Sequence, residues 1–450
     1  MNSTLPRPAL AGRYGLLGLP LAFVALPVYV HLPNHYAQTY GVALGALGAV
    51  LLLSRSVDAV VDPWLGRLGD RLYAHSWPAV VWASVVLAML VALGFAGLFF
   101  PPWTDSPQTL LVWAAVMLTL SHLAYSGLML LHQAWAARQG GGAATQSRWV
   151  AWREGLGLCG VLLASGLPSL AGWGVTTAVL AVMLALGLWA WQSAQRACPG
   201  DDPTELATTG GASAALPTAP NPPGPGAPGS GDLWTPWRQG VFRRLLAVFM
   251  VNGLASAIPA TLVLFFVQDR LQAPAALEPL FLGLYFAAGA LSFPLWLRVI
   301  GRIGLVRSWL WGMLLSVLAF GGVLLLGPGD SHAFLGVCAL SGLALGADLT
   351  VPAALLNQSI DECGQRQRSE GAFMGWWNLA TKLNLALAAG LALPLLQLWG
   401  YAPGRQTPEA LWALGLAYGL LPCLLKLAAA ALAWRLLARP AISLRPLQGA

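Results

Sequence analysis

Residues 55–71, RSVDAVVDPWLGRLGDR, place charged side chains at the end of an apolar run that is long enough to cross a membrane. Arg55, Asp58 and Asp62 stand at positions i, i+3 and i+7, so in a helix all three share one face. Each ionisable group at the centre of a bilayer helix costs about 2.5–3.5 kcal/mol. Charges retained at that cost indicate a functional site.

Two carboxylates one helical turn apart repel each other, which disfavours having both ionised unless a cation compensates. Asp58 and Asp62 therefore form a pair that can take up and release a proton or a small hard cation. Two alternatives remain open. Arg55 can neutralise Asp58 as a simple packing pair, and Asp62, which precedes Pro63, can cap or anchor the end of the span.

The composition around this stretch sets the class of protein. Of 450 residues, 57% are apolar and 9% are charged, whereas soluble domains carry about 25% charged residues. A soluble enzyme, a disordered chain and a disulfide-stapled scaffold are excluded on these figures. Apolar runs of about twenty residues also exclude a barrel, whose strands alternate over about ten residues. The chain is predicted to be an all-α, multi-pass membrane protein embedded in a lipid bilayer.

Apolar windows of membrane-spanning length predict twelve transmembrane helices. The first run extends well past the apolar core of a cleavable signal, so it should remain as a signal anchor. The predicted spans are 12–34, 42–64, 79–100, 108–134, 148–170, 173–193, 241–268, 277–298, 308–327, 333–358, 372–398 and 410–437.

The arginines give the orientation. With both termini in the cytoplasm, eighteen arginines fall on the cytoplasmic side and only Arg270 and Arg405 fall outside. This strong bias follows the positive-inside rule, and we expect a bacterial-type inner membrane. Basic residues do not interleave with aromatic ones on a polar surface, so no nucleic-acid partner is expected.

One long polar stretch divides the chain. Residues 196–238 are rich in Pro, Gly, Ala and Ser, which predicts a flexible cytoplasmic linker between a six-helix bundle at 1–195 and another at 239–450. Two pseudo-symmetric six-helix halves with a site between them are typical of the major facilitator fold. We therefore expect alternating access by a protein that works as a monomer.

A lysine in the second half matches the acids in the first. Lys382 lies far from either end of the span within GWWNLATKLNLALAAG (375–390), so it needs a carboxylate partner from another helix. Asp58 and Asp62 are the natural partners, which would join the halves across a cavity. Alternatively, Lys382 points into a polar crevice without a role. Lys426 lies nearer the cytoplasmic end of its span, and we expect it to extend toward the interface.

Four further residues are candidates for the wall of a substrate cavity. Arg153 can bind an anionic or hydroxylated group or can anchor the helix at the interface. Asp348 can line the cavity or hydrogen-bond between helices. Trp376 can stack on a sugar or an acyl group, and Asn378 lies on the same span. No metal site is predicted, because His122 and His132 stand ten residues apart and the five cysteines form no CxxC pair.

Two charged turns are candidates for gates that clamp helix ends on the cytoplasmic side. Generic charged loops are the alternative for each. The residues concerned are Gly66, Asp70 and Arg71 after the second span, and Arg366, Arg368 and Glu370 before the eleventh.

These motifs resemble the glycoside–pentoside–hexuronide:cation symporter family, the melibiose-permease-like branch of the major facilitator superfamily. The likeness rests on residues 55–71, on SIDECGQRQRSEGAFMGWWNLATKLNLALAAG (359–390) and on the following Gly400-Tyr401. It implies a cation-coupled symporter with Asp58 and Asp62 as cation ligands and Lys382 beside them. Ser126 stands where the family places a hydroxyl ligand.

The chain also departs from that pattern. Val61 replaces an asparagine that helps to hold sodium in melibiose permease, which favours H⁺ over Na⁺ as the coupling ion. Ala22 and Met129 stand where that permease has sugar-binding acids, whereas Arg153 matches its span-five arginine. Lysophospholipid carriers share the motif, so an amphiphile is the alternative substrate.

We therefore expect a symporter for a small organic solute, such as a sugar or glycoside, with a monovalent cation as its second partner. No cofactor beyond the coupling ion and no catalytic residue are expected. A membrane-embedded enzyme would need a nucleophile and a donor-binding loop, which are not evident. A sensor that keeps the fold without moving solute is the remaining alternative.

Overall fold

The computed structural model describes residues 8–42, 44–102, 106–196, 232–274, 277–399 and 407–438, and no strand occurs among them. The predicted linker residues 197–231 and the Gly400-Tyr401 pair lie outside these ranges. The helices are α1 (Pro8–Gly15), α2 (Gly18–Leu26), α3 (Leu32–Tyr40), α4 (Leu44–His75), α5 (Trp77–Phe99), α6 (Pro107–Arg138), α7 (Ala143–Arg196), α9 (Thr235–Arg238), α10 (Gly240–Phe265), α11 (Glu278–Ile303), α12 (Leu305–Gly321), α13 (Ser331–Glu362), α14 (Glu370–Leu398), α15 (Pro408–Gly415) and α16 (Leu421–Ala433).

Within the described residues, ten helical segments are long and apolar enough to cross a membrane. They correspond to ten of the predicted spans. The other two predicted spans are α4 and α14, which carry the buried acids and Lys382. The protein is thus an all-α membrane protein with twelve transmembrane helices, as its composition predicted.

Helix boundaries differ from the prediction where glycine and proline interrupt the backbone. The predicted spans 148–170 and 173–193 form α7, which bends at Gly172, where φ is 76° and ψ is 172°. The predicted span 12–34 is broken into α1, α2, a π-helical turn (Pro27–His31) and α3. Proline lacks the N–H of a regular helical hydrogen bond, so Pro27 favours such an irregular turn.

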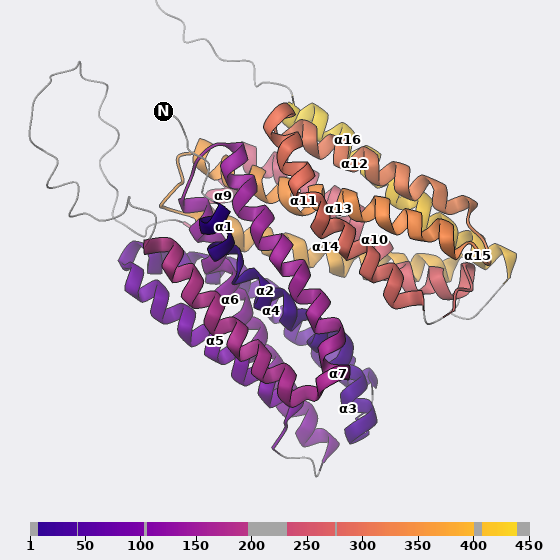
Figure 1. Ribbon diagram of the computed structural model, residues 1–450, viewed down its shortest axis with the longest axis horizontal. Coiled ribbons are helices and arrows are strands. Elements are labelled where there is room, and N and C mark those ends of the chain that lie inside the picture. The colour runs from indigo at the N-terminus through magenta and orange to yellow at the C-terminus, as the bar shows by residue number, and fades with distance from the viewer. Residues whose placement is uncertain are drawn as a thin grey trace, which may run out of the picture.

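The helices form two groups that touch at one end and diverge at the other (Figure 1). Helices α1–α7 make one half and α10–α16 the other. The touching end holds α1 and α9, and the far ends hold α3 and α15. Each half has its own apolar core: one cluster runs from Ala11 to Ala194, and another lies around Phe266 and Tyr418. Contacts between the halves run mainly through α4 with α14 and α7 with α11 and α13.

Two glycines allow a close approach between the halves. A Cβ atom added at Gly66 on α4 would collide with the carbonyl oxygen of Gly371 on α14, and one added at Gly371 would collide with that of Gly66. Small residues allow membrane helices to approach this closely. The crossing brings the charged faces of α4 and α14 together deeper in the protein.

The predicted linker is not free over its whole length. Leu233 is buried, and its carbonyl oxygen accepts a 2.9 Å hydrogen bond from Trp376 Nε1. Trp234 and Trp237 pack against the same indole, with ring centroids 5.2 Å away in each case. Residues 232–238 were predicted to be flexible, whereas in the structure Leu233 and the two tryptophans contact Trp376 of the second half.

Candidate functional site

The site is centred on Lys382, which reaches from α14 in the second half to two helices of the first. Its Nζ lies 2.5 Å from Asp58 Oδ2, 2.7 Å from Asp62 Oδ2 and 2.9 Å from Ser126 Oγ. Ser126, on α6, donates a 2.6 Å hydrogen bond to Asp58 Oδ1. The four side chains that the sequence predicted for the coupling site therefore meet around Lys382.

These groups are removed from water. The side chains of Asp58 and Asp62 are 3% and 0% exposed, and that of Lys382 is 15% exposed. With all three ionised, these three groups carry a net charge of −1, and the half-buried Arg55 lies on the wall of the adjoining cavity. Neither carboxylate oxygen of Asp62 has a hydrogen-bond partner of good geometry among the described residues. Ion pairs in a low-dielectric interior must repay a large desolvation cost, so the excess charge favours binding of one proton or cation.

A cavity of about 170 Å³ adjoins the cluster and lies between the halves. Asp58, Ser126 and Lys382 form part of its wall, and the predicted residues Arg55 and Asn378 lie there too. Several other wall residues can form hydrogen bonds, and the rest are apolar. The wall also includes Ser121, His122, Tyr125, Thr381, Val24, Ala25, Val28, Met129 and Leu385. The cavity can thus contact a small molecule with both polar and apolar parts.

Arg55 was predicted as the charge partner of Asp58. The ion-pair partner that the structure shows for Asp58 is Lys382. Arg55 is half-buried on the same face of α4 and has its own interactions. The ammonium of Lys382 approaches the acids directly from the facing helix.

Asp348 belongs to a second ionic cluster within the second half. Its carboxylate pairs with Lys426 of α16 and accepts hydrogen bonds from Asn252 (3.1 Å), Trp309 (3.2 Å) and Ser256 (3.3 Å). Lys426 also donates to Asn252 Oδ1 at 2.8 Å. Lys426 was expected to extend to the interface, but it is 3% exposed, so that expectation is wrong. It turns inward because a buried carboxylate lies within reach.

The predicted cavity residues Arg153 and Trp376 lie elsewhere. Arg153 Nε and Nη2 donate to Glu154 Oε1 at 3.0 and 2.5 Å, and neither residue lines the cavity between the halves. Trp376 lies against residues 233–237, as described above. The expected grouping of Arg153, Asp348 and Trp376 around one substrate is therefore not found, because each side chain has a partner within its own region.

The predicted gate residues lie where the halves touch. Asp70, at the end of α4, accepts hydrogen bonds from the backbone N–H groups of Gly371 (2.6 Å) and Ala372 (2.9 Å). These are among the first N–H groups of α14, which have no partner within the helix. A carboxylate is also favoured at a helix N-terminus by the helix dipole. Asp70 thus ties α4 to α14.

A second set of contacts between the halves lies beside Asp70. Arg138 of α6 pairs with Glu370 at 3.2 Å, and Glu370 is fully buried. Arg366 donates to the carbonyl oxygens of Arg138 (3.1 Å) and Gln139 (2.8 Å). Arg71 and Arg368, which were also predicted as gate residues, are exposed.

Several partners in these clusters were missed at the sequence level. Gln146 and Asn357 join α7 to α13 through a 2.9 Å hydrogen bond, and both are buried. Asn252 and Trp309 complete the cluster around Asp348. A buried polar residue in an apolar span is the available signal, and it shows that a partner is needed but not which one.

This arrangement of two six-helix halves with an ionic cluster between them defines a multi-pass membrane transporter of the major facilitator fold. The chain matches the family described as MFS/sugar transport protein over residues 13–216 and 219–437, and it belongs to that family. Over 116 residues it is 29% identical to the candidate glycoside/cation symporter YagG of Escherichia coli (strain K12). That match covers 25% of this chain and 24% of YagG.

Solved structures show the same fold. A bacterial homologue of the iron transporter ferroportin in an outward-facing state aligns with a TM-score of 0.65 at 17% identity, over 96% of this chain and 99% of that one. The proton:xylose symporter XylE bound to 6-bromo-6-deoxy-D-glucose aligns with a TM-score of 0.62 at 13% identity, over 95% and 94% of the two chains.

Proposed function

We propose that this transporter is a cation-coupled symporter, with H⁺ favoured over Na⁺, that moves a small organic solute by alternating access. The observation that carries this proposal is the contact of Lys382 with Asp58 and Asp62 across the two halves. An ion pair that links two moving bodies makes their relative position depend on its charge.

The coupling step follows from the excess negative charge. When Asp58 or Asp62 binds a proton or a cation, the attraction that holds Lys382 against α4 weakens, because one acid no longer contributes its charge. The halves can then change their relative position more easily. A proton is favoured because, among the described residues, the oxygen ligands in contact with Lys382 come from two carboxylates and the Ser126 hydroxyl. A hard metal cation takes more oxygen ligands than these.

The contacts around Asp70 and Glu370 close the end of the molecule at which the halves touch. We infer from the positive-inside bias that this end faces the cytoplasm. We therefore assign this conformation to an outward-open transporter of a bacterial-type inner membrane. We expect the protein to act as a monomer and to need no cofactor beyond the coupling ion.

A sugar or glycoside is the first candidate substrate. It is supported by the family description, by the name of YagG and by the hydrogen-bonding side chains of the cavity between the halves. A lysophospholipid-like amphiphile is the second. It is favoured by the apolar part of the same wall, which includes Val24, Val28 and Leu385.

The proposal is tested by uptake into proteoliposomes. A panel of sugars, glycosides and lysophospholipids is first screened for thermal stabilisation of the purified protein at two pH values. Uptake of the best ligand is then measured under an imposed pH gradient and under an imposed sodium gradient. We expect the pH gradient to drive uptake in the native protein, and we expect Asp62→Asn to reduce that uptake more than tenfold.

Asp361→Asn is the matched control, because Asp361 is an exposed acid that pairs with Arg366 at 3.4 Å away from the cluster. It should retain gradient-driven uptake. Persistence of that uptake in both Asp58→Asn and Asp62→Asn would overturn the coupling assignment. A larger response to the sodium gradient than to the pH gradient would identify Na⁺ as the coupling ion in place of H⁺.

A further inference from the structure

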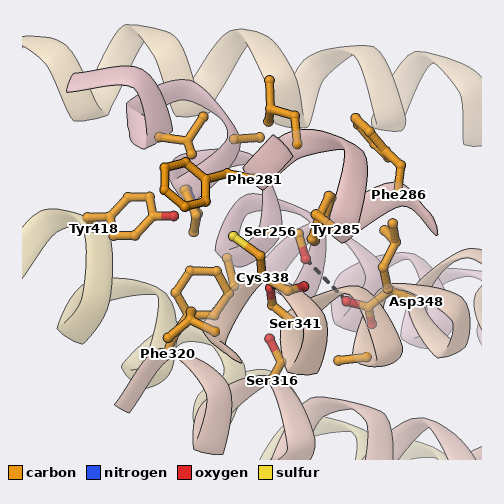
Figure 2. Close-up of a pocket in the computed structure, with 18 residues that line it drawn as sticks. Ser256, Phe281, Tyr285, Phe286, Ser316, Phe320, Cys338, Ser341, Asp348 and Tyr418 are labelled. Carbon is orange, nitrogen blue, oxygen red and sulfur yellow. Dashed lines mark hydrogen bonds between the residues drawn. The ribbon is translucent and has the colours of Figure 1, made fainter. Parts of the chain in front are cut away.

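The second half contains a cavity of its own, about 180 Å³ in volume (Figure 2). All of its lining residues fall between 255 and 418, and it shares none of them with the cavity between the halves. Most of the wall is apolar, and aromatic rings of Phe281, Phe320 and Tyr418 form one side. The cavity is therefore separate from the coupling cluster.

One end of this cavity is polar. Ser256 and Asp348 lie together there, and a 3.3 Å hydrogen bond joins them. The Asp348 carboxylate already accepts from Asn252, Trp309 and Ser256 and pairs with Lys426, so its charge is compensated. The hydrogen of the Ser256 hydroxyl is directed to Asp348 or to the Asn252 carbonyl oxygen, 3.2 Å away. The lone pairs of Ser256 Oγ can thus accept a hydrogen bond from a ligand.

The size and charge of the cavity limit what can bind. An apolar protein cavity of about 150 Å³ holds a benzene molecule. A cavity of about 180 Å³ can therefore hold one or two small fused rings. Because the Asp348–Lys426 pair is neutral as a whole, a charged ligand would lose its hydration without gaining a partner. Aromatic walls favour an aromatic ligand through stacked or edge-to-face contacts.

We propose that the cavity between Phe281, Phe320, Tyr418 and Ser256 is a second binding site, which takes a neutral aromatic molecule with one hydrogen-bond donor. The rings of the ligand contact the aromatic wall, and its donor reaches Ser256 Oγ. The site does not depend on the coupling mechanism, since its walls belong to one half and do not include Lys382, Asp58 or Asp62.

Indole and indene form a matched pair of probes. Both are neutral two-ring molecules, but only indole carries an N–H donor. Binding is measured by equilibrium dialysis of the purified full chain against each probe, with protein-free micelles subtracted. We expect saturable binding of one indole per chain, and we expect indene to bind about threefold to tenfold more weakly, the size of a neutral hydrogen bond.

Two variants locate the site. Ser256→Ala should remove the preference for indole over indene. Ser316→Leu places a larger side chain in the cavity wall and should reduce the affinity for both probes more than tenfold. Ser165→Leu, at an exposed position of α7, is the control and should bind as the native protein does. Thermal unfolding of each variant verifies that it is folded.

Binding that does not saturate, or that survives Ser316→Leu unchanged, would overturn the proposal. So would an unchanged indole preference in a folded Ser256→Ala protein. These results are independent of gradient-driven uptake, which tests the coupling cluster alone.

Discussion

The two lysine–aspartate clusters have similar chemistry but different positions. Lys382 joins α14 of the second half to α4 and α6 of the first half. Lys426 and Asp348, in contrast, both lie within the second half. In the first cluster Lys382 is the more exposed partner, at 15%, whereas in the second cluster Asp348 is 14% exposed and Lys426 is 3% exposed. A buried ion pair can couple a motion only when its partners move relative to each other. The pair around Asp348 instead joins helices of the second half.

The largest expected effect separates the two clusters. Lys426→Met should lower the free energy of unfolding by about 3–5 kcal/mol, because it leaves Asp348 buried without its cation. Lys382→Met should cost less stability, since Asp58 and Asp62 lie at the seam between the halves, where a small separation of the halves would hydrate them. The measurement is chemical denaturation of both variants in detergent micelles, followed by tryptophan fluorescence.

The double variant Lys426→Met with Asp348→Leu is the control, and it should recover much of the lost stability because no charge remains unpaired. Equal losses in the two single variants would contradict the distinction between a cluster at the seam and a cluster within one half.

A smaller effect is expected where the halves touch. Asp70→Asn replaces a carboxylate that accepts from two backbone N–H groups, and a hydrogen bond to a charged group is worth about 1.5–3 kcal/mol. The closed end should therefore open more often. In a cysteine-free background, Asn378→Cys in the cavity should react about tenfold or more faster with an impermeant maleimide added on the cytoplasmic side.

Asp361→Asn serves as the comparison here, because its exposed pair with Arg366 should contribute at most about 1 kcal/mol. Labelling at the same rate in the two variants would show that Asp70 does not hold the halves together.

The smallest expected effect concerns the glycine contact. Gly66→Ala adds a methyl group that must displace α14 at Gly371, and overpacking of this kind costs about 1–3 kcal/mol. Labelling of Asn378→Cys from the cytoplasmic side should increase, and the free energy of unfolding should fall by less than this amount, because separation of the halves relieves the collision. Gly301→Ala is the matched control, since a Cβ there meets no atom within 4 Å and alanine favours a helix. An increase in labelling with both variants would assign the effect to helix propensity instead.

Much of the fold could be predicted from local sequence because a bilayer restricts the possible structures. Apolar windows identified all twelve spans, including α4 and α14 with their charges. Errors arose at residues whose effect depends on neighbours. The break at Pro27 and the packing of residues 232–238 against Trp376 require knowledge of what lies beside each segment.

In the candidate site, too, some contacts could be predicted from the sequence and others depended on neighbouring helices. A buried lysine needs an acid and a buried acid needs a cation, so the pairing of Lys382 with Asp58 and Asp62 could be expected from the sequence. The pairing of Lys426 with Asp348 was not anticipated, because depth along a span does not show which way a side chain points. Nor does a sequence show that Arg153 pairs with its neighbour Glu154 rather than facing a cavity.

Composition and charge determined by themselves that this chain crosses a membrane many times, since water-exposed apolar helices and lipid-exposed charges are both costly. Tertiary structure alone decided which charges face the seam, which stay within one half and where cavities remain. The physical reason is that burial fixes the need for a partner, whereas the crossing of helices such as α4 and α14 selects the partner.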